Sequence, residues 1–251
     1  MPEVVAAVTD EARRGPVLDV ASAVASLMRA RVREVGVASD DPDRAALAVL
    51  EALEPADVLV GVVPAAVDPA APSWRVMRES TKPLVLLPPD LPSGPNPIGR
   101  VLVPLDGSRE CARAVEHTIE LCRRADVDLV VLHVFGPGTA PPYWDQDVHA
   151  LNVWAEEFMS RHVRGAGVRL EVRVGAPEDS VVEVAEGLGA DLIALGWSQR
   201  LEDGRARTVR RSVLEAHVPV MLVPVSGRDA DGEDPPQGRW ALAEQPGARM
   251  S

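Results

Sequence analysis

The chain has 251 residues, of which 46% are hydrophobic and 25% charged, and its formal net charge is −12. This composition is typical of a soluble globular protein, and its acidic balance with only five Trp, two Phe and one Tyr excludes general nucleic-acid binding. No apolar run reaches the ~18 to 20 residues of a membrane span, and the first residues lack a secretory pattern. We therefore expect a cytoplasmic protein that binds neither nucleic acid nor membranes.

The first 90 residues contain three segments typical of an alternating α/β fold. They are an apolar run at 4–10 (VVAAVTD), a helix-then-strand pattern at 42–61 (PDRAALAVLEALEPADVLVG) and a second apolar run at 83–88 (PLVLLP). The last run has a proline on each side of four apolar residues. A second run, at 219–224 (PVMLVP), is flanked by prolines in the same way. Both short apolar strands are predicted to be sheet edges that need a partner, and they are natural edges to pair with each other.

A proline-rich seam divides the chain. Residues 86–100 hold five prolines and two glycines, which can continue neither a helix nor a central strand. We therefore expect an N-terminal domain at 1–90, a linker at 91–99 and a second domain at 100–226. Residues 227–251 are rich in Gly, Pro and charge and show no apolar period, so we expect a disordered tail.

Beyond the seam, apolar runs alternate with segments of helical spacing. The expected strands are residues 101–105, 128–134, 168–174, 191–196 and 219–224, and the expected helical segments are residues 111–122, 146–163, 180–188 and 209–217. Strands that alternate with helices form a parallel sheet covered on both faces. This half is therefore expected to be an α/β domain with a parallel, five-stranded Rossmann-like sheet.

The first 90 residues repeat this plan. Three features match in order: Asp10 with Asp106, residues 42–61 with 177–196, and residues 83–88 with 219–224. Asp10 and Pro83 are 73 positions apart, whereas Asp106 and Pro219 are 113 apart, a shortfall of 40. That is about one strand–helix unit. We therefore expect a shortened, four-stranded first half that lacks the unit corresponding to residues 128–134 and the helix after them.

Four segments of the second half resemble the universal stress protein family. They are VLVPLDGS (101–108), VVLHVF (130–135), VRVGAPEDSVVEVAEGLGADLIALG (172–196) and SVLEAHVPVMLVPV (212–225). The resemblance covers residues 97–226 well and residues 1–90 more faintly, as in the tandem members of the family. It implies that the two copies, a degenerate N-terminal one and a complete C-terminal one, pack as an internal pseudo-dimer.

The family resemblance also implies a ligand site, because a subset of members binds ATP at the carboxyl ends of the strands. Ligands of open α/β sheets occupy the crevice where the strand order reverses, which indicates the same place. The candidate residues are Pro104, Asp106, Gly107 and Ser108 on one wall and Gly196, Arg211, Ser212 and Val213 on the other. Asp106 either accepts a hydrogen bond from a ribose or an adenine amino group, or caps the helix that starts near Arg109.

The phosphate-binding motif of the nucleotide-binding members, G-x2-G-x9-G-[ST], is matched only in part. Gly196 and Ser212 match, whereas Gln199 and Arg211 stand where the second and third glycines should be, and they are 12 positions apart instead of 10. Glycines in such a loop tolerate positive φ angles and let backbone N–H groups approach phosphate oxygens. We therefore expect the backbone cradle to be lost.

Residues 200–211 (RLEDGRARTVRR) contain five arginines against two acids, a local charge of +3. Two interpretations stay open. The arginines, Arg211 among them, either hold phosphate with their side chains and the helix dipole, or are solvated and paired with Glu202, Asp203 or carboxylates of the other half. Trp197 likewise either stacks on a base or packs locally.

No enzyme or metal signature is present: the sequence has no G-x-S-x-G elbow, no G-x4-GK-[ST] loop and no HExxH pattern. Cys111 and Cys122 lie about 16 Å apart along one predicted helix, too far to bridge, and are interpreted as buried structural thiols.

Two classes of function follow. The first is a non-enzymatic stress-response protein with a degenerate nucleotide-binding motif, which acts through an unidentified protein partner and with homodimerisation left open. The alternative is a sensor of an adenine nucleotide such as ATP or AMP, or of another anion, that uses the arginine-rich loop in place of glycines.

Overall fold

The computed structural model describes residues 1–37, 39, 41–94, 97–136, 148–163, 167–199 and 205–225. The N-terminal half (residues 1–94) contributes the elements β1 (Glu3–Val8), η1 (Glu11–Arg13), α1 (Arg14–Met28), β2 (Arg31–Gly36), α2 (Pro42–Leu53), β3 (Val58–Pro64), α3 (Pro72–Glu79) and β4 (Leu84–Leu87). The C-terminal half (residues 97–225) contributes β5 (Arg100–Pro104), α4 (Arg109–Arg124), β6 (Asp128–Phe135), α5 (Val148–His162), β7 (Arg169–Val174), α6 (Pro177–Leu188), β8 (Leu192–Trp197), α7 (Arg205–Glu215) and β9 (Val220–Pro224). The prediction of four strands in the N-terminal half and five in the C-terminal half is confirmed.

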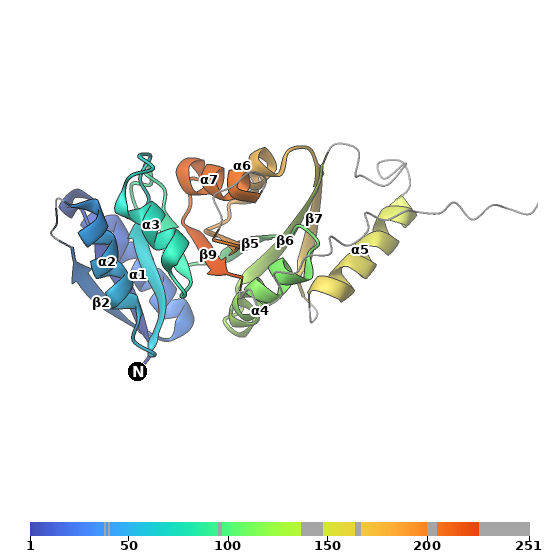
Figure 1. Ribbon diagram of the computed structural model, residues 1–251. Coiled ribbons are helices and arrows are strands. Elements are labelled where there is room, and N and C mark those ends of the chain that lie inside the picture. Colours follow the sequence, from blue (N-terminus) through green and yellow to red (C-terminus); the bar gives the residue numbers. More distant parts are fainter. Residues whose placement is uncertain are drawn as a thin grey trace, which may run out of the picture.

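The strands form one mixed sheet in the order β2-β1-β3-β4-β9-β8-β5-β6-β7. Neighbours within each half are parallel, and β4 pairs with β9 in antiparallel fashion, with Leu84 opposite Leu222 and Leu86 opposite Val220. Figure 1 shows the two halves side by side along this sheet. The prediction that the two proline-flanked strands are edges that need a partner is confirmed, because each covers the other.

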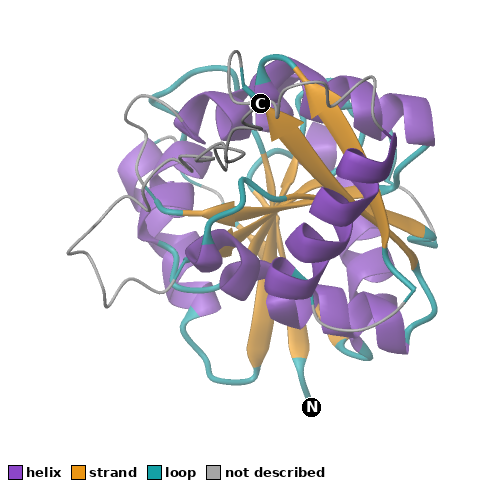
Figure 2. Cartoon of the chain, turned by 90° about the vertical axis from the view of Figure 1, so that its right-hand side faces the viewer, coloured by secondary structure: helices purple, strands orange, loops and turns teal. Residues whose placement is uncertain are grey.

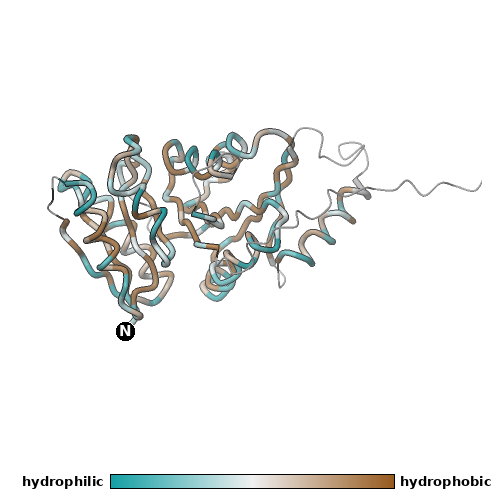
Figure 3. The backbone as a smooth tube through the Cα atoms, in the orientation of Figure 1, coloured by the Kyte–Doolittle hydropathy of each residue, from teal (hydrophilic) through white to brown (hydrophobic). Residues whose placement is uncertain are grey.

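Helices cover both faces of the sheet (Figure 2). One buried cluster holds the inward side chains of α1, α4 and α5, and the other holds those of α2, α3, α6 and α7. Along β4, Val85 and Leu87 belong to the first cluster, and Leu84 and Leu86 to the second. Both clusters continue into β9, so the apolar core runs through the junction between the halves, and Figure 3 shows apolar residues along the central strands.

The helices begin at residues with suitable local chemistry. Pro42, Pro72 and Pro177 occupy first-turn positions of α2, α3 and α6, where a missing N–H costs nothing. The Asp41 carboxylate accepts hydrogen bonds from the N–H groups of Asp43 (2.9 Å) and Arg44 (3.4 Å). The matching starts of α2 and α6 explain why the internal repeat was readable there.

One detail of the repeat was wrong. The unit missing from the N-terminal half was predicted to be the counterpart of β6 and the helix after it. In the sheet, however, β2 pairs with β1 as β6 pairs with β5, so the absent strand by position is the counterpart of β7. A strand's place in a sheet depends on its hydrogen-bond partner, which a comparison of lengths along the chain does not reveal.

Some predictions fall outside the described residues. These are the expected tail at 227–251, part of the linker at 91–99, residues 146 and 147 of the expected helix and residues 200–204 of the arginine-rich stretch. Within the described residues, none of the helices combines the length and apolarity needed to cross a membrane.

Candidate functional site

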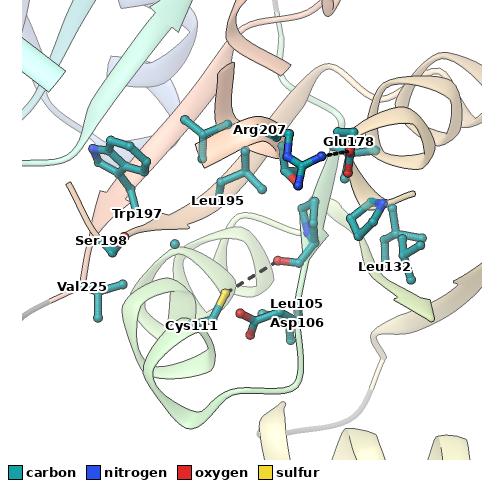
Figure 4. Close-up of a pocket in the computed structure, with 17 residues that line it drawn as sticks. Leu105, Asp106, Cys111, Leu132, Glu178, Leu195, Trp197, Ser198, Arg207 and Val225 are labelled. Atoms are coloured by element: carbon teal, nitrogen blue, oxygen red, sulfur yellow. Dashed lines mark hydrogen bonds and ion pairs between the residues drawn. The ribbon is translucent and has the colours of Figure 1, made fainter. Parts of the chain in front are cut away.

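A cavity of about 310 Å³ lies at the carboxyl ends of β5 and β8 (Figure 4). These strands are neighbours, but the chain continues from β5 toward β6 on one side and from β8 toward β9 on the other. The cavity is therefore at the point where the strand order reverses, which is the ligand-binding position of open α/β sheets.

The cavity is mostly apolar with a few polar side chains. Its apolar wall contains Leu105, Leu132, Val134, Val181, Leu195, Trp197, Val209 and Val225, and its polar groups include Asp106, Glu178, Ser198, Arg207 and Thr208. Figure 4 shows Trp197, Ser198 and Val225 on one side, and Arg207 and Glu178 on another. Apolar walls with few convergent polar groups are typical of small-molecule sites.

Of the predicted first wall, Pro104 and Asp106 line the cavity. Asp106 does not cap α4. Its Oδ1 accepts a hydrogen bond from the Ser108 N–H at 2.8 Å, and Ser108 is the N-cap, with its Oγ accepting from the Cys111 N–H at 3.2 Å. Gly107 between them has φ +86°, which favours glycine. Gly107 and Ser108 therefore shape the loop that holds the exposed Asp106 at the cavity.

Gly196 also lines the cavity, for a reason of packing. A Cβ atom at this position would lie 3.1 Å from Cys111 Sγ and 3.3 Å from its Cα. Glycine here lets β8 approach the first turn of α4, and thereby brings the two walls of the site together.

Gln199 corrects one expectation. We expected the replacement of glycine by Gln199 to lose the glycine conformation, yet its φ is +63°. Its side-chain amide donates a hydrogen bond of 2.5 Å to the Ser80 carbonyl of the N-terminal half. The left-handed conformation costs about 1–2 kcal/mol for a residue with a side chain, and this bond offsets part of that cost.

Arg211, Ser212 and Val213 are among the predicted site residues, but they are absent from the residues that line the cavity. Arg211 forms ion pairs with Asp179 and, at 2.9 Å, with Glu215. Val213 and Ser212 are fully buried, and Ser212 Oγ has no hydrogen-bond partner among the described residues. The reason is that α7 begins at Arg205 rather than near Arg211, so these three residues lie well inside the helix.

Among the described residues that line the cavity, the cation is Arg207, which the sequence did not single out among the five arginines. It lies in the first turn of α7, beside Thr208, and forms an ion pair of 3.7 Å with Glu178. The signal available in the sequence was the helical period of Ala206, Val209, Val213 and Ala216, all of them buried. That period gives the rotation of α7 but not the residue at which the helix starts.

Trp197 packs against the N-terminal half while lining the cavity. Its side chain is 1% exposed, and its Nε1 donates a hydrogen bond of 3.0 Å to the Met77 carbonyl. In Figure 4 its ring lies at the cavity, with the nitrogen turned away from Arg207. Trp197 was expected either to stack on a base or to pack locally. Packing against the N-terminal half accounts for its ring nitrogen, which is bonded to Met77.

Comparison with known proteins identifies the family. The model of the universal stress protein family matches residues 97–224. The chain belongs to the universal stress protein family. A universal stress protein of Methanocaldococcus jannaschii is 27% identical over 146 residues, which cover 52% of this chain and 85% of that protein.

Two solved structures show that the likeness of fold extends over both halves. A universal stress protein from Pseudomonas aeruginosa has a TM-score of 0.60 at 13% identity and covers 89% of this chain and 93% of its own. Another, from Archaeoglobus fulgidus, has a TM-score of 0.56 at 18% identity and covers 91% and 88%. This universal stress protein therefore shares its α/β fold with relatives over most of its length.

A cluster of rings lies beneath the Asp106 loop of this universal stress protein. The rings of His133 and Phe158 are 4.8 Å apart, and His133 Nδ1 lies 2.9 Å from the Leu105 carbonyl oxygen. Burial lowers the pKa of His133, partly opposed by the bond to Leu105 and the charge of Asp106. Burial also lowers the pKa of His162. Among the described residues, no three His, Cys, Asp or Glu side chains gather as a metal site would require.

Proposed function

We propose that this universal stress protein is a non-enzymatic regulator whose C-terminal half binds an adenine nucleotide with a short phosphate chain. The observation that carries the proposal is the apolar cavity at the strand-order reversal, with Asp106 on one wall and Arg207 at another. A volume of about 310 Å³ is at the small end for ligand sites, which favours one nucleoside over a dinucleotide. The Asp106 carboxylate would accept from ribose hydroxyls or the adenine amino group.

The charges around the cavity favour a monophosphate over a triphosphate. Among the described lining residues, Arg207 is the only cation, and Glu178 and Asp106 are negative. Arg211 is paired with Asp179 and Glu215. One guanidinium at the start of α7, together with the helix dipole, suits a single phosphate group.

The N-terminal half, in this proposal, takes the place of a second subunit in an internal pseudo-dimer, and the ligand alters contacts with a protein partner. Among the described residues that line the cavity, none is a nucleophile with a histidine beside it as its base, so we assign binding and not catalysis.

Thermal unfolding with adenosine, AMP, ATP or inorganic phosphate tests the proposal. A ligand at ~100 times its Kd stabilises the folded protein by ~2.7 kcal/mol, which raises the midpoint by several degrees. We expect a larger rise with AMP than with adenosine, loss of that difference in Arg207→Gln, and its retention in the matched control Arg211→Gln. A flat response to every nucleotide would refute nucleotide binding and leave protein interaction as the function.

A further inference from the structure

The last residue of β8 and the two residues after it, 197–199, join the cavity to the N-terminal half. Trp197 and Ser198 line the cavity. Trp197 donates to the Met77 carbonyl at 3.0 Å, and Gln199 donates to the Ser80 carbonyl at 2.5 Å. Both acceptors belong to the end of α3, 120 and 119 positions away along the chain.

These two carbonyls are groups that α3 cannot satisfy alone. The last carbonyls of a helix have no partner within it and need side chains, water or turn hydrogen bonds. The helix ends at Glu79, and the Val76 carbonyl is satisfied by the Ser80 N–H. The Met77 and Ser80 carbonyls receive their donors from the other half. Residues 197–199 therefore cap the end of α3, and α3 in turn holds residues 197–199 in place.

Gln199 is suited to this task by its backbone as well as its side chain. At φ +63° its backbone is in the left-handed region that favours glycine, the residue that the family motif has at this position. The backbone at residue 199 thus keeps a glycine-like conformation while the amide reaches the N-terminal half. A second contact lies nearby, where the Arg210 guanidinium is 5.5 Å from the centre of the Trp74 ring.

We propose that Gln199 is a positioning residue through which α3 of the N-terminal half holds the Trp197 wall of the cavity in place. The N-terminal half then serves as the support of the C-terminal ligand site. The consequence for ligand affinity rests on the proposed function, whereas the support of the wall does not.

Two variants isolate the side chain of Gln199. Gln199→Gly keeps the left-handed backbone at little cost and removes the amide, and Gln199→Asn tolerates that backbone but is one methylene too short to reach Ser80. Arg75→Gln is the matched control, because Arg75 lies on the same helix but pairs with Asp43 and Glu79 within the N-terminal half.

The reaction rate of Cys111 with a thiol reagent, in full-length protein without ligand, reports on the wall. Cys111 lines the cavity and lies against Gly196. Cys122 is fully buried, and burial raises the pKa of its thiol to about 12, so Cys122 does not react with the reagent. A hydrogen bond worth its usual net amount shifts the closed–open equilibrium by about 2- to 12-fold. We expect both Gln199 variants to speed Cys111 labelling by that factor, with Arg75→Gln unchanged and all unfolding midpoints close to wild type.

Equal Cys111 rates in wild type and both Gln199 variants would overturn the inference, as would an equal increase in the Arg75→Gln control. AMP titration separates this outcome from the proposed function. If wild type binds AMP, both Gln199 variants should weaken it by at most the same 2- to 12-fold factor, because apparent affinity falls only with the fraction of closed protein. If wild type binds no nucleotide, the proposed function fails, but the Cys111 rates still decide whether α3 supports the wall.

Discussion

The two halves of the molecule share a framework but differ where their strands end. In the C-terminal half, the loop after β5 and the residue after β9 lie on either side of an open cavity that both line. In the N-terminal half, Arg13 follows β1 and donates hydrogen bonds to the Pro89 carbonyl at 2.6 Å and the Pro88 carbonyl at 2.8 Å, just after β4. The corresponding strand ends are thus tied together by one side chain.

A second difference lies in the helix before the last strand of each half, α3 before β4 and α7 before β9. In α3 the Trp74 side chain is buried and donates from Nε1 to the Ala66 carbonyl at 2.9 Å, so it fills the space beneath its own loop. In α7 the first turn instead presents Arg207 and Thr208 to the cavity. A few side chains at the strand ends therefore decide whether a half of this fold forms a ligand cavity or a support.

The largest expected effect tests whether the halves form one cooperative unit. Leu222→Ala, at the β4–β9 junction, should lower the free energy of unfolding by about 2–5 kcal/mol in a single transition, because the apolar core is continuous there. Denaturant unfolding followed by tryptophan fluorescence and circular dichroism measures this. The exposed Leu47→Ala should change it by less than about 0.5 kcal/mol. Two separate transitions, only one of them shifted, would contradict the continuous core.

Arg13 and Arg109 occupy corresponding positions after the first strand of each half. Replacing each of them tests whether the two halves differ as described. Arg13→Ala should cost about 1–3 kcal/mol of stability, because two carbonyls lose their donor. Arg109 is exposed, and Arg109→Ala should be nearly neutral. Paired unfolding curves measure both changes, and equal effects would show that Arg13 does not tie its half together.

A pH series should locate a sensitivity in the C-terminal half, since all five histidines lie beyond residue 100. Burial lowers the pKa of His133 below its ordinary 6.5, so the folded state resists a proton that the unfolded state takes up. Its contribution to stability is present above about pH 6.5 and is lost as the pH falls through the lowered pKa.

His133→Asn keeps a donor for the Leu105 carbonyl and cannot titrate, so its unfolding midpoint should fall less steeply below pH 6.5 than that of wild type. The exposed His117→Asn serves as the control and should keep the wild-type slope. Identical slopes for all three proteins would contradict a role of His133 in the pH response.

The smallest expected effect concerns Glu178, which shares Arg207 with the proposed phosphate. Glu178→Gln should raise AMP affinity by about 1.5- to 5-fold, the range of an exposed ion pair, and leave adenosine unchanged. Calorimetric titration measures both. The exposed Glu183→Gln on the same helix is the control, and an equal gain for adenosine would show that the phosphate does not meet Arg207.

The sequence predicted the location of the site but not all of its residues. Asp106 lies two residues after β5, and Gly196 is the second-last residue of β8. Both strands are clear apolar runs, so the place of these two residues at the carboxyl ends could be predicted. The spacing of the family motif predicts Arg211 at the site, but that spacing contains no information on where α7 begins. The helix starts at Arg205, which puts Arg207 at the cavity and Arg211 on the outer surface.

What the sequence determined by itself is the alternation of strands and helices, the shortened repeat and the two proline-flanked edges, because hydrophobic period and proline chemistry act over a few neighbouring residues. Only the tertiary structure decided which arginine faces the cavity and that Gln199 adopts a glycine-like φ. Both depend on contacts between distant segments: the packing of α7 on the sheet, and a hydrogen bond from Gln199 to Ser80 in the other half.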